Sequence, residues 1–288
     1  MTFNNPEIEK EYERLINLYP DLPEYQHPLI NFSDTLRAYM ALADYFTDPT
    51  SEVAERMLVG LRTEHLLYSA LGRQVVCYDG HRKYTNDIDI CSTLFYGMVK
   101  NHSFSDGNKR TALLTLLYQL NLFGQYPSCS VREYEKLVVA VAANDLPNKY
   151  GKVWKKFVKF DDPEIRTISY LLRRMTKKKD HSYHLRITAK DMVSRLEKLG
   201  VETTVENGKL HFRRTIPARW FKQERNLRYS MVFGGWTRSI GPQTAREILT
   251  SLELYDQYAD YQSFIDGQEP YYSLIQEFEV PLRRLKDE

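Results

Sequence analysis

Apolar residues recur at intervals of three and four along two neighbouring segments, residues 87–101 and 109–123. This spacing places them on one side of an α-helix in each segment. The apolar positions are Ile88, Cys91, Leu94, Phe95, Met98 and Val99 in the first segment, and Leu113, Leu116, Leu117, Leu120 and Phe123 in the second. Asn86 or Asp87 could cap the first helix, and Gly124 is a natural end for the second. The pattern predicts two core helices joined by a short loop.

The pattern changes after residue 185. Thr188 begins a helical pattern that ends at Gly200, and residues 201–215 alternate around Asn207-Gly208, a typical hairpin turn. Residues 229–237 then indicate a third strand and residues 242–256 a closing helix. The order α-β-β-β-α predicts a smaller α+β domain, which follows a mainly α-helical domain along the chain.

Composition excludes several classes of protein. The chain has 288 residues and is 42% hydrophobic, as expected for a globular protein. Its N-terminus lacks the apolar region of a signal peptide, and no apolar run is long enough to span a membrane. Three cysteines, Cys77, Cys91 and Cys129, are too few and too widely spaced for a disulfide framework. We therefore expect a cytoplasmic protein with no membrane partner.

Charge is distributed unevenly. Residues 171–228 contain sixteen Lys and Arg against six Asp and Glu, whereas residues 251–288 contain nine acidic residues and three basic ones. This asymmetry indicates a separate domain with its own electrostatic character. We predict a first domain at residues 1–172, a basic linker at 173–184 and an accessory α+β domain at 185–288.

The loop between the two predicted helices, "NHSFSDGNKRTALL", concentrates the candidate chemistry. Its Gly107 lies where the second helix starts, so free N–H groups and the helix dipole favour an anion there. Asp106 is a hard oxygen ligand suited to Mg²⁺, and Lys109 and Arg110 can neutralise phosphates. His102 could accept a proton from an attacking hydroxyl. These groups indicate phosphoryl or nucleotidyl transfer.

The stretch "HSFSDGNKRTALL" resembles the signature of the Fic/Doc superfamily, in which His-x-Phe-x-Asp/Glu-Gly-Asn precedes a basic pair. The nucleotidylating branch continues with Gly-Arg, and the death-on-curing (Doc) branch with Lys-Arg. Lys109-Arg110 therefore favours the Doc branch, as does Leu113, which replaces a second arginine of the nucleotidylating branch. The preceding stretch "GLRTEHLLYSALGRQ" also resembles Doc-like chains.

The resemblance implies a helical core with a β-hairpin flap and a transferase that uses ATP and Mg²⁺ on a hydroxyl of a target protein. Doc-like proteins phosphorylate a translation factor and act as toxins of toxin–antitoxin pairs. His102 would be the catalytic base, Asp106 the metal ligand and Phe104 the structural anchor. The phosphate and nucleotide cradle would consist of Gly107, Asn108, Lys109 and Arg110.

The flap is expected within residues 75–87, where Asp79-Gly80 is a good hairpin turn. An exposed strand there could pair with an extended segment of the target. The residues proposed for target docking are Val75, Val76, Tyr78, Arg82 and Tyr84.

Two alternatives to phosphate transfer stay open. One is Fic-type transfer of AMP. The other is a nucleic-acid-binding or scaffold protein with an inactive Fic-like core, in which basic and aromatic residues of the accessory domain contact phosphates and bases. These residues are Arg213, Arg214, Arg219, Trp220, Phe221, Lys222, Arg225 and Arg228. An equally good interpretation is a solvated basic face that binds an acidic partner or the acidic tail.

Regulation differs from a common Fic pattern, in which Ser/Thr-x-x-x-Glu-Gly/Asn supplies a glutamate to the second arginine of the site. Ser51 and Glu55 have the spacing, but Arg56 follows and the second arginine is missing. We therefore expect restraint from a separate antitoxin or from the accessory domain.

Overall fold

The computed structural model describes residues 3–25, 28–49, 54–178, 187–216, 224–254 and 270–286. The chain forms two compact units, one of Met1–Lys179 with Tyr271–Glu288, and one of Asp180–Pro270. This division differs from the expected boundaries at 172 and 185–288. Residues 173–178 finish a helix and a strand of the first unit, and the C-terminal segment also packs there. The remainder of the predicted linker, 179–184, lies outside the described residues.

The first unit is mainly α-helical, as predicted. Its helices are α1 (Pro6–Leu18), α2 (Phe32–Thr47), α3 (Glu64–Gly72), the short 3₁₀ helix η1 (Arg73–Val75), α4 (Asp87–Asn101), α5 (Asn108–Leu122), α6 (Val131–Ala142), α7 (Leu146–Lys149), α8 (Gly151–Phe157), α9 (Pro163–Met175), α13 (Pro270–Glu277) and α14 (Glu279–Arg284). Two short antiparallel pairs accompany them, β1 (Cys77–Tyr78) with β2 (His81–Arg82) and β3 (Gln125–Pro127) with β4 (Thr176–Lys178).

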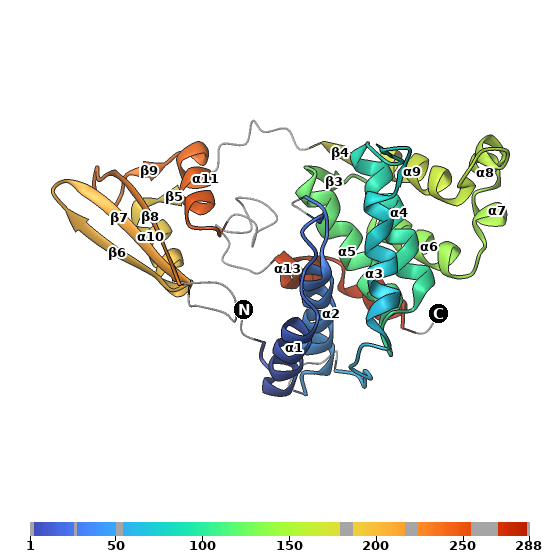
Figure 1. Ribbon diagram of the computed structural model, residues 1–288, viewed down its shortest axis with the longest axis horizontal. Coiled ribbons are helices and arrows are strands. Elements are labelled where there is room, and N and C mark those ends of the chain that lie inside the picture. The colour runs from blue at the N-terminus through green and yellow to red at the C-terminus, as the bar shows by residue number, and fades with distance from the viewer. Residues whose placement is uncertain are drawn as a thin grey trace. The chain divides into compact units, whose positions relative to one another are not determined.

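Local chemistry sets the ends of the two central helices. The side chain of Asn86 accepts the N–H of Ile88 at 3.1 Å and caps α4, and Gly124 follows α5 with a φ of 66°. Every residue from Arg110 to Leu120 is buried, although the sequence predicted only one apolar side for α5. The reason is that α5 is central and contacts α2, α4 and α6 (Figure 1).

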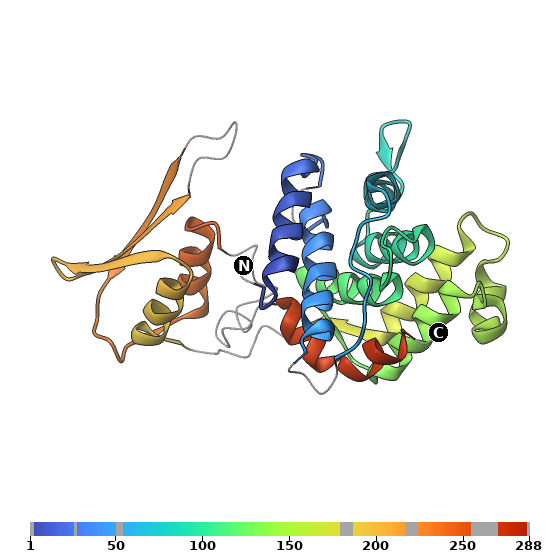
Figure 2. The same cartoon turned by 90° about the horizontal axis from the view of Figure 1, so that it is seen from below.

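The C-terminal helices α13 and α14 belong to the helical unit. The rings of Tyr271 and Tyr118 lie 4.5 Å apart, and the hydroxyl of Tyr45 donates to Glu279 at 2.7 Å. Phe278 is fully buried. In Figure 2 these red helices run along the edge of the bundle that contains α2. The acidic charge of this segment suggested a place in the accessory domain, but its apolar residues pack on the core.

A buried carboxylate joins the two ends of the helical unit. Asp44, 1% exposed on α2, accepts the backbone N–H groups of Asn4 at 3.0 Å and Asn5 at 2.8 Å. It also accepts the hydroxyl of Tyr272 from the C-terminal segment. Three donors therefore satisfy a charge that would be costly to bury alone.

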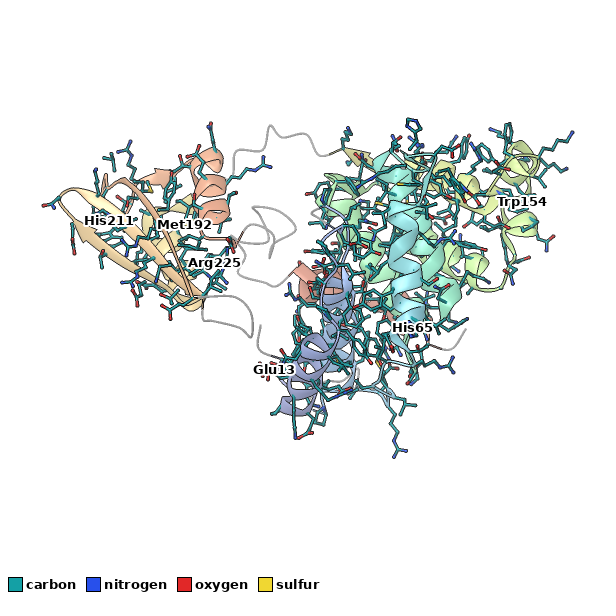
Figure 3. All side chains as sticks on the ribbon, in the orientation of Figure 1. Glu13, His65, Trp154, Met192, His211 and Arg225 are labelled. Carbon is teal, nitrogen blue, oxygen red and sulfur yellow. The ribbon has the colours of Figure 1, made fainter. Side chains whose placement is uncertain are left out.

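The second unit contains β5 (Ile187–Thr188), α10 (Ala189–Lys198), β6 (Val201–Glu206), β7 (Lys209–Ile216), β8 (Arg225–Val232), β9 (Ser239–Ile240) and α11 (Pro242–Ser251). The antiparallel sheet β6-β7-β8 covers one core with α10 and α11. Thr188 caps α10, and Asn207 and Gly208 have the positive φ values of the predicted turn. The third strand begins four residues earlier than expected. Figure 3 labels Met192 on α10 and His211 on β7.

Within the described parts of both units, no helix combines the length and apolar character needed to cross a membrane.

Candidate active site

An extended segment holds the loop that follows α4. Leu61 and Phe104 form an antiparallel bridge, the N–H of Arg62 donates to the carbonyl of Ser103 at 2.8 Å, and that of Ser105 donates to the carbonyl of Gly60 at 2.9 Å. These backbone hydrogen bonds fix the path of the loop between α4 and α5. The sequence had not assigned any role to residues 58–62.

Phe104 anchors the loop in the core. Its fully buried ring stacks on Tyr39 with the ring centroids 4.0 Å apart. Burial raises the pKa of Tyr39 to about 12, despite an opposing hydrogen bond from the N–H of Gly60. The Tyr39 hydroxyl therefore stays protonated and holds the 58–60 segment by accepting that N–H at 2.8 Å. The anchoring role predicted for Phe104 agrees with this position.

Asn108 has a structural task besides the phosphate-binding role that the resemblance implies. Its side-chain oxygen accepts the N–H of Phe104 at 2.8 Å, and its side-chain nitrogen donates to the carbonyl of Phe104 at 2.8 Å. The amide is thus used to close the loop on itself. The second N–H of this side chain and the backbone N–H of Asn108, in the first turn of α5, are left for an anion.

Gly107 and Asp106 shape the start of α5. Gly107 has a φ of 73°, and a Cβ atom there would lie 2.6 Å from the Cε of Met57. Asp106 accepts the N–H of Gly107 through Oδ1 at 2.5 Å and lines a pocket with its carboxylate. The described residues contain no cluster of three His, Cys, Asp or Glu side chains for a metal. A Mg²⁺ ion held by one carboxylate and by phosphates fits this donor set.

The pocket has a volume of about 200 Å³ and gathers the site residues predicted in the loop from His102 to Arg110, apart from Phe104. Its lining consists of Arg62, His102, Ser105, Asp106, Gly107, Asn108, Lys109, Arg110, Leu285 and Lys286. His102 ends α4 in the left-handed conformation, with a φ of 49°, and is exposed. Among the described residues its imidazole has no hydrogen-bond partner. A proton acceptor therefore lies at the edge of a pocket rich in cations.

Arg110 is a buried cation with unused donors. Its side chain is 1% exposed, lies over the ring of Phe46 at 5.2 Å and forms an ion pair with Glu55 through Nη1. Within the described parts of the chain, Nε and Nη2 have no hydrogen-bond partner. A buried donor without a partner costs about 1–3 kcal/mol. Such a cost is expected where a ligand supplies the missing acceptors.

Lys286 is a functional candidate that the sequence did not reveal, and Glu55 is one that the sequence analysis considered and set aside. Glu55 binds Arg110, the first arginine of the motif, although the sequence suggested that Glu55 had no arginine partner. Its other oxygen lies 2.9 Å from Nζ of Lys286. Ser51, the other half of the proposed inhibitory motif, lies outside the described residues. The spacing from Ser51 to Glu55 was the one available signal.

The flap hairpin forms where it was predicted. Asp79 and Gly80 have φ values of 48° and 78°, and Tyr78 pairs with His81 in a short, exposed ladder. Tyr78 itself is 63% exposed. Val75 and Val76 precede the strands, and Arg82 is exposed in β2. The proposed docking residues therefore surround one hairpin.

The hairpin does not lie at the pocket. It precedes α4, whose fifteen residues correspond to about 22 Å, whereas His102 follows α4. None of the proposed docking residues lines the pocket, and Figure 2 shows the hairpin projecting from the bundle. The extended segment next to the loop from His102 to Arg110 is 58–62. Target docking by the hairpin residues stays a prediction.

Asp162 fixes the base of the hairpin to α9. Its Oδ2 accepts the hydroxyl of Tyr84 at 2.7 Å and pairs with Nζ of Lys83. Burial raises the pKa of Asp162, but the hydrogen bonds from Lys83 and Tyr84 outweigh it, so the pKa lies below its usual value of 3.8. The contacts with Lys83 and Tyr84 therefore favour the ionised form of the Asp162 carboxylate.

Asp162→Asn is expected to lower the melting temperature of the helical unit at pH 7 by about 2 °C, because a partly exposed pair contributes at most ~1 kcal/mol. A lowered pKa stabilises the fold above pH 3.8 and loses its effect as the pH falls through the folded-state value. The difference between the two proteins should therefore be constant near neutral pH and vanish in acid. Thermal unfolding from pH 7 to pH 3 measures it, with Asp161→Asn as the control.

The basic residues of the second unit have several tasks. Arg214 donates to the carbonyls of Leu252 and Glu253 at 2.8 and 2.9 Å, and Arg225 pairs with the Glu253 carboxylate at 2.7 Å. Arg214 thus satisfies carbonyl groups at the end of α11, and Arg225 pairs with a side chain just beyond it. Arg213 and Arg228 lie opposite each other on the exposed face of the sheet. Arg219, Trp220, Phe221 and Lys222 lie outside the described residues.

Residues 29–120 match the sequence model of the Fic/DOC family. This segment runs from before α2 to near the end of α5 and includes the whole loop from His102 to Arg110, so the match supports the Fic/Doc superfamily for this part of the chain. Members of this family are typically transferases that act on a target. Neither the curated proteins nor the solved structures contained a match to the chain.

Proposed function

We propose that the chain is a Mg²⁺-ATP-dependent transferase that phosphorylates a hydroxyl group of a target protein. The observation that carries this proposal is one pocket that gathers the exposed His102, Asp106 and Arg110, whose Nε and Nη2 have no hydrogen-bond partner among the described residues. Guanidinium donors in this arrangement suit phosphate oxygens. Lys109 and the first turn of α5 add further positive charge.

In the proposed reaction, the oxygen of the target hydroxyl attacks the γ-phosphorus of ATP. The bond from that phosphorus to the β–γ bridging oxygen breaks, and ADP leaves with the electron pair. The imidazole of His102 accepts the hydroxyl proton. Asp106 would hold Mg²⁺, which neutralises phosphate charge when bound. Arg110 and Lys109 orient the phosphates, so that positioning provides most of the rate acceleration.

Two features favour phosphate over AMP as the transferred group. The side chain of Lys109 lines the pocket where the nucleotidylating branch has only glycine. Leu113 is fully buried in α5 and adds no second arginine. A bulky cation near the start of α5 would alter how a triphosphate is seated, so that its terminal phosphate faces His102.

A double-label experiment tests this choice. The full chain is incubated with Mg²⁺, a bacterial lysate and ATP labelled at either the α or the γ position. We expect protein-bound label from the γ position alone. Label retained from the α position would establish AMP transfer and overturn the proposal of phosphorylation.

Absence of protein-bound label from both positions would favour the second candidate, a nucleic-acid-binding or scaffold protein with an inactive core. One observation favours that candidate. Arg213 and Arg228 are directly opposite on an open sheet face, where like charges repel unless an anion lies between them. Glu202, on the other side of Arg213, compensates one of the two charges.

We further propose a cytoplasmic location and a role as a toxin, with a translation factor as target and a separate antitoxin as partner. The location rests on the three widely spaced cysteines, which suit a reducing compartment. The toxin role, the target and the antitoxin rest on the resemblance of Lys109-Arg110 to the Doc branch.

A further inference from the structure

One cation of the pocket comes from a segment far away in the sequence. Lys286 follows α14, and its Nζ lies 2.9 Å from Oε2 of Glu55. Leu285 and Lys286 line the same pocket as His102, Asp106 and Arg110. The family match ends at residue 120, so this contribution lies well outside the matched segment.

The C-terminal segment is anchored in a way that positions this cation. Phe278 and Leu282 are fully buried, and Leu285, next to Lys286, is 2% exposed. The N–H of Lys286 donates to the carbonyl of Arg283 at 3.2 Å, so the last helical turn extends to the lysine. The hydroxyl of Tyr271 donates to the carbonyl of Asp34 at 3.0 Å at the other end of the segment. The backbone that carries Lys286 is therefore fixed to the helical core.

The charges around Glu55 are not balanced by the protein alone. One carboxylate contacts both Arg110 and Lys286, and Arg110 still has two donors without partners among the described residues. A polyphosphate carries more negative charge than one carboxylate and would attract both cations. Lys286 is 37% exposed, and its flexible side chain has three donors, so it can leave Glu55 for a phosphate oxygen.

We propose that Lys286 contacts a phosphate of the bound nucleotide and that the C-terminal segment therefore forms part of the nucleotide site. This inference rests on the proposed function, because it assumes that the pocket binds a nucleotide phosphate. Glu55 occupies Lys286 and Arg110 in the absence of nucleotide, and the phosphates take over both cations on binding.

The test uses the full chain and Mg²⁺-ATP affinity measured by calorimetry. Lys286→Met should weaken affinity about tenfold, the loss expected for one charged contact at a partly exposed site. Arg283→Met removes a charge from the same helix without touching the pocket and should change affinity less than twofold. Equal affinities of wild type and Lys286→Met would overturn the inference.

A second comparison separates contact with phosphate from mere support of Glu55. In a Glu55→Gln background, Lys286→Met should again weaken Mg²⁺-ATP binding about tenfold. If Lys286 only positioned Glu55, the substitution would have no effect in this background, and the inference would be wrong. Failure of the wild-type chain to bind Mg²⁺-ATP would overturn the proposed function together with this inference. Binding by wild type without a Lys286 effect overturns the inference alone.

Discussion

We expect phosphate transfer to fall by about 10²–10⁴-fold when His102 is replaced, which is the usual loss for a general base. The imidazole lies at the edge of the pocket, where it can meet an incoming hydroxyl, and it does not bind the phosphates in the proposed reaction. Mg²⁺-ATP affinity should therefore stay within about twofold of wild type. Single-turnover transfer rates and calorimetry measure the two quantities separately.

His102→Asn is the preferred variant because asparagine tolerates the left-handed conformation at this position better than alanine. His65→Asn, at an exposed histidine in the first turn of α3 (Figure 3), is the matched control and should transfer phosphate at the wild-type rate. By contrast, Asp106→Ala should weaken Mg²⁺-ATP binding itself. Normal transfer by His102→Asn would remove His102 from the mechanism.

Glu55→Gln has the second large effect, and it acts in opposite directions on stability and on affinity. Without nucleotide, the buried Arg110 and Lys286 lose their negative partner, which costs about 1–2 kcal/mol and lowers the melting temperature by about 2–6 °C. Mg²⁺-ATP then meets two cations without having to displace a carboxylate. We expect its affinity to rise about tenfold, and thermal unfolding with and without Mg²⁺-ATP measures both effects.

The chain contains a close control for this variant. Glu135 is 12% exposed, against 13% for Glu55, and also pairs with a C-terminal cation, Arg284. It does not line the pocket. Glu135→Gln should lower stability slightly and leave nucleotide affinity unchanged. A Glu55→Gln protein with unchanged or weaker affinity would show that Glu55 does not compete with nucleotide.

Local signals predicted much of the fold. Asn86 caps α4, Asp79-Gly80 and Asn207-Gly208 form hairpin turns, and Gly107 adopts a positive φ at the start of α5. Each of these features depends on a few adjacent residues, whose backbone preferences and short-range hydrogen bonds do not need the rest of the chain. The motif loop could be identified because its charged and amide residues are adjacent in the sequence and resemble a family signature.

Long-range pairs could not be predicted in this way. The contact of Glu55 with Arg110 joins residues 55 positions apart, and that of Glu55 with Lys286 spans most of the chain. The acidic charge of residues 251–288 suggested the wrong unit for α13 and α14, because charge does not report where Phe278 and Leu282 are buried. Their spacing of four, continued by Leu285, was the signal of a core-facing helix.

The division of the helical unit into two stretches of sequence also affects how the protein is made. Ribosomes add about 5–20 residues per second, so the synthesis of Asp180–Pro270 delays the C-terminal helices by roughly 5–20 s. During this interval the nascent chain already has the His102 loop, but Asp44 lacks Tyr272 and the surface that Phe278 and Leu282 cover is open to chaperones. A ribosome-bound intermediate therefore carries His102 before it carries the complete pocket.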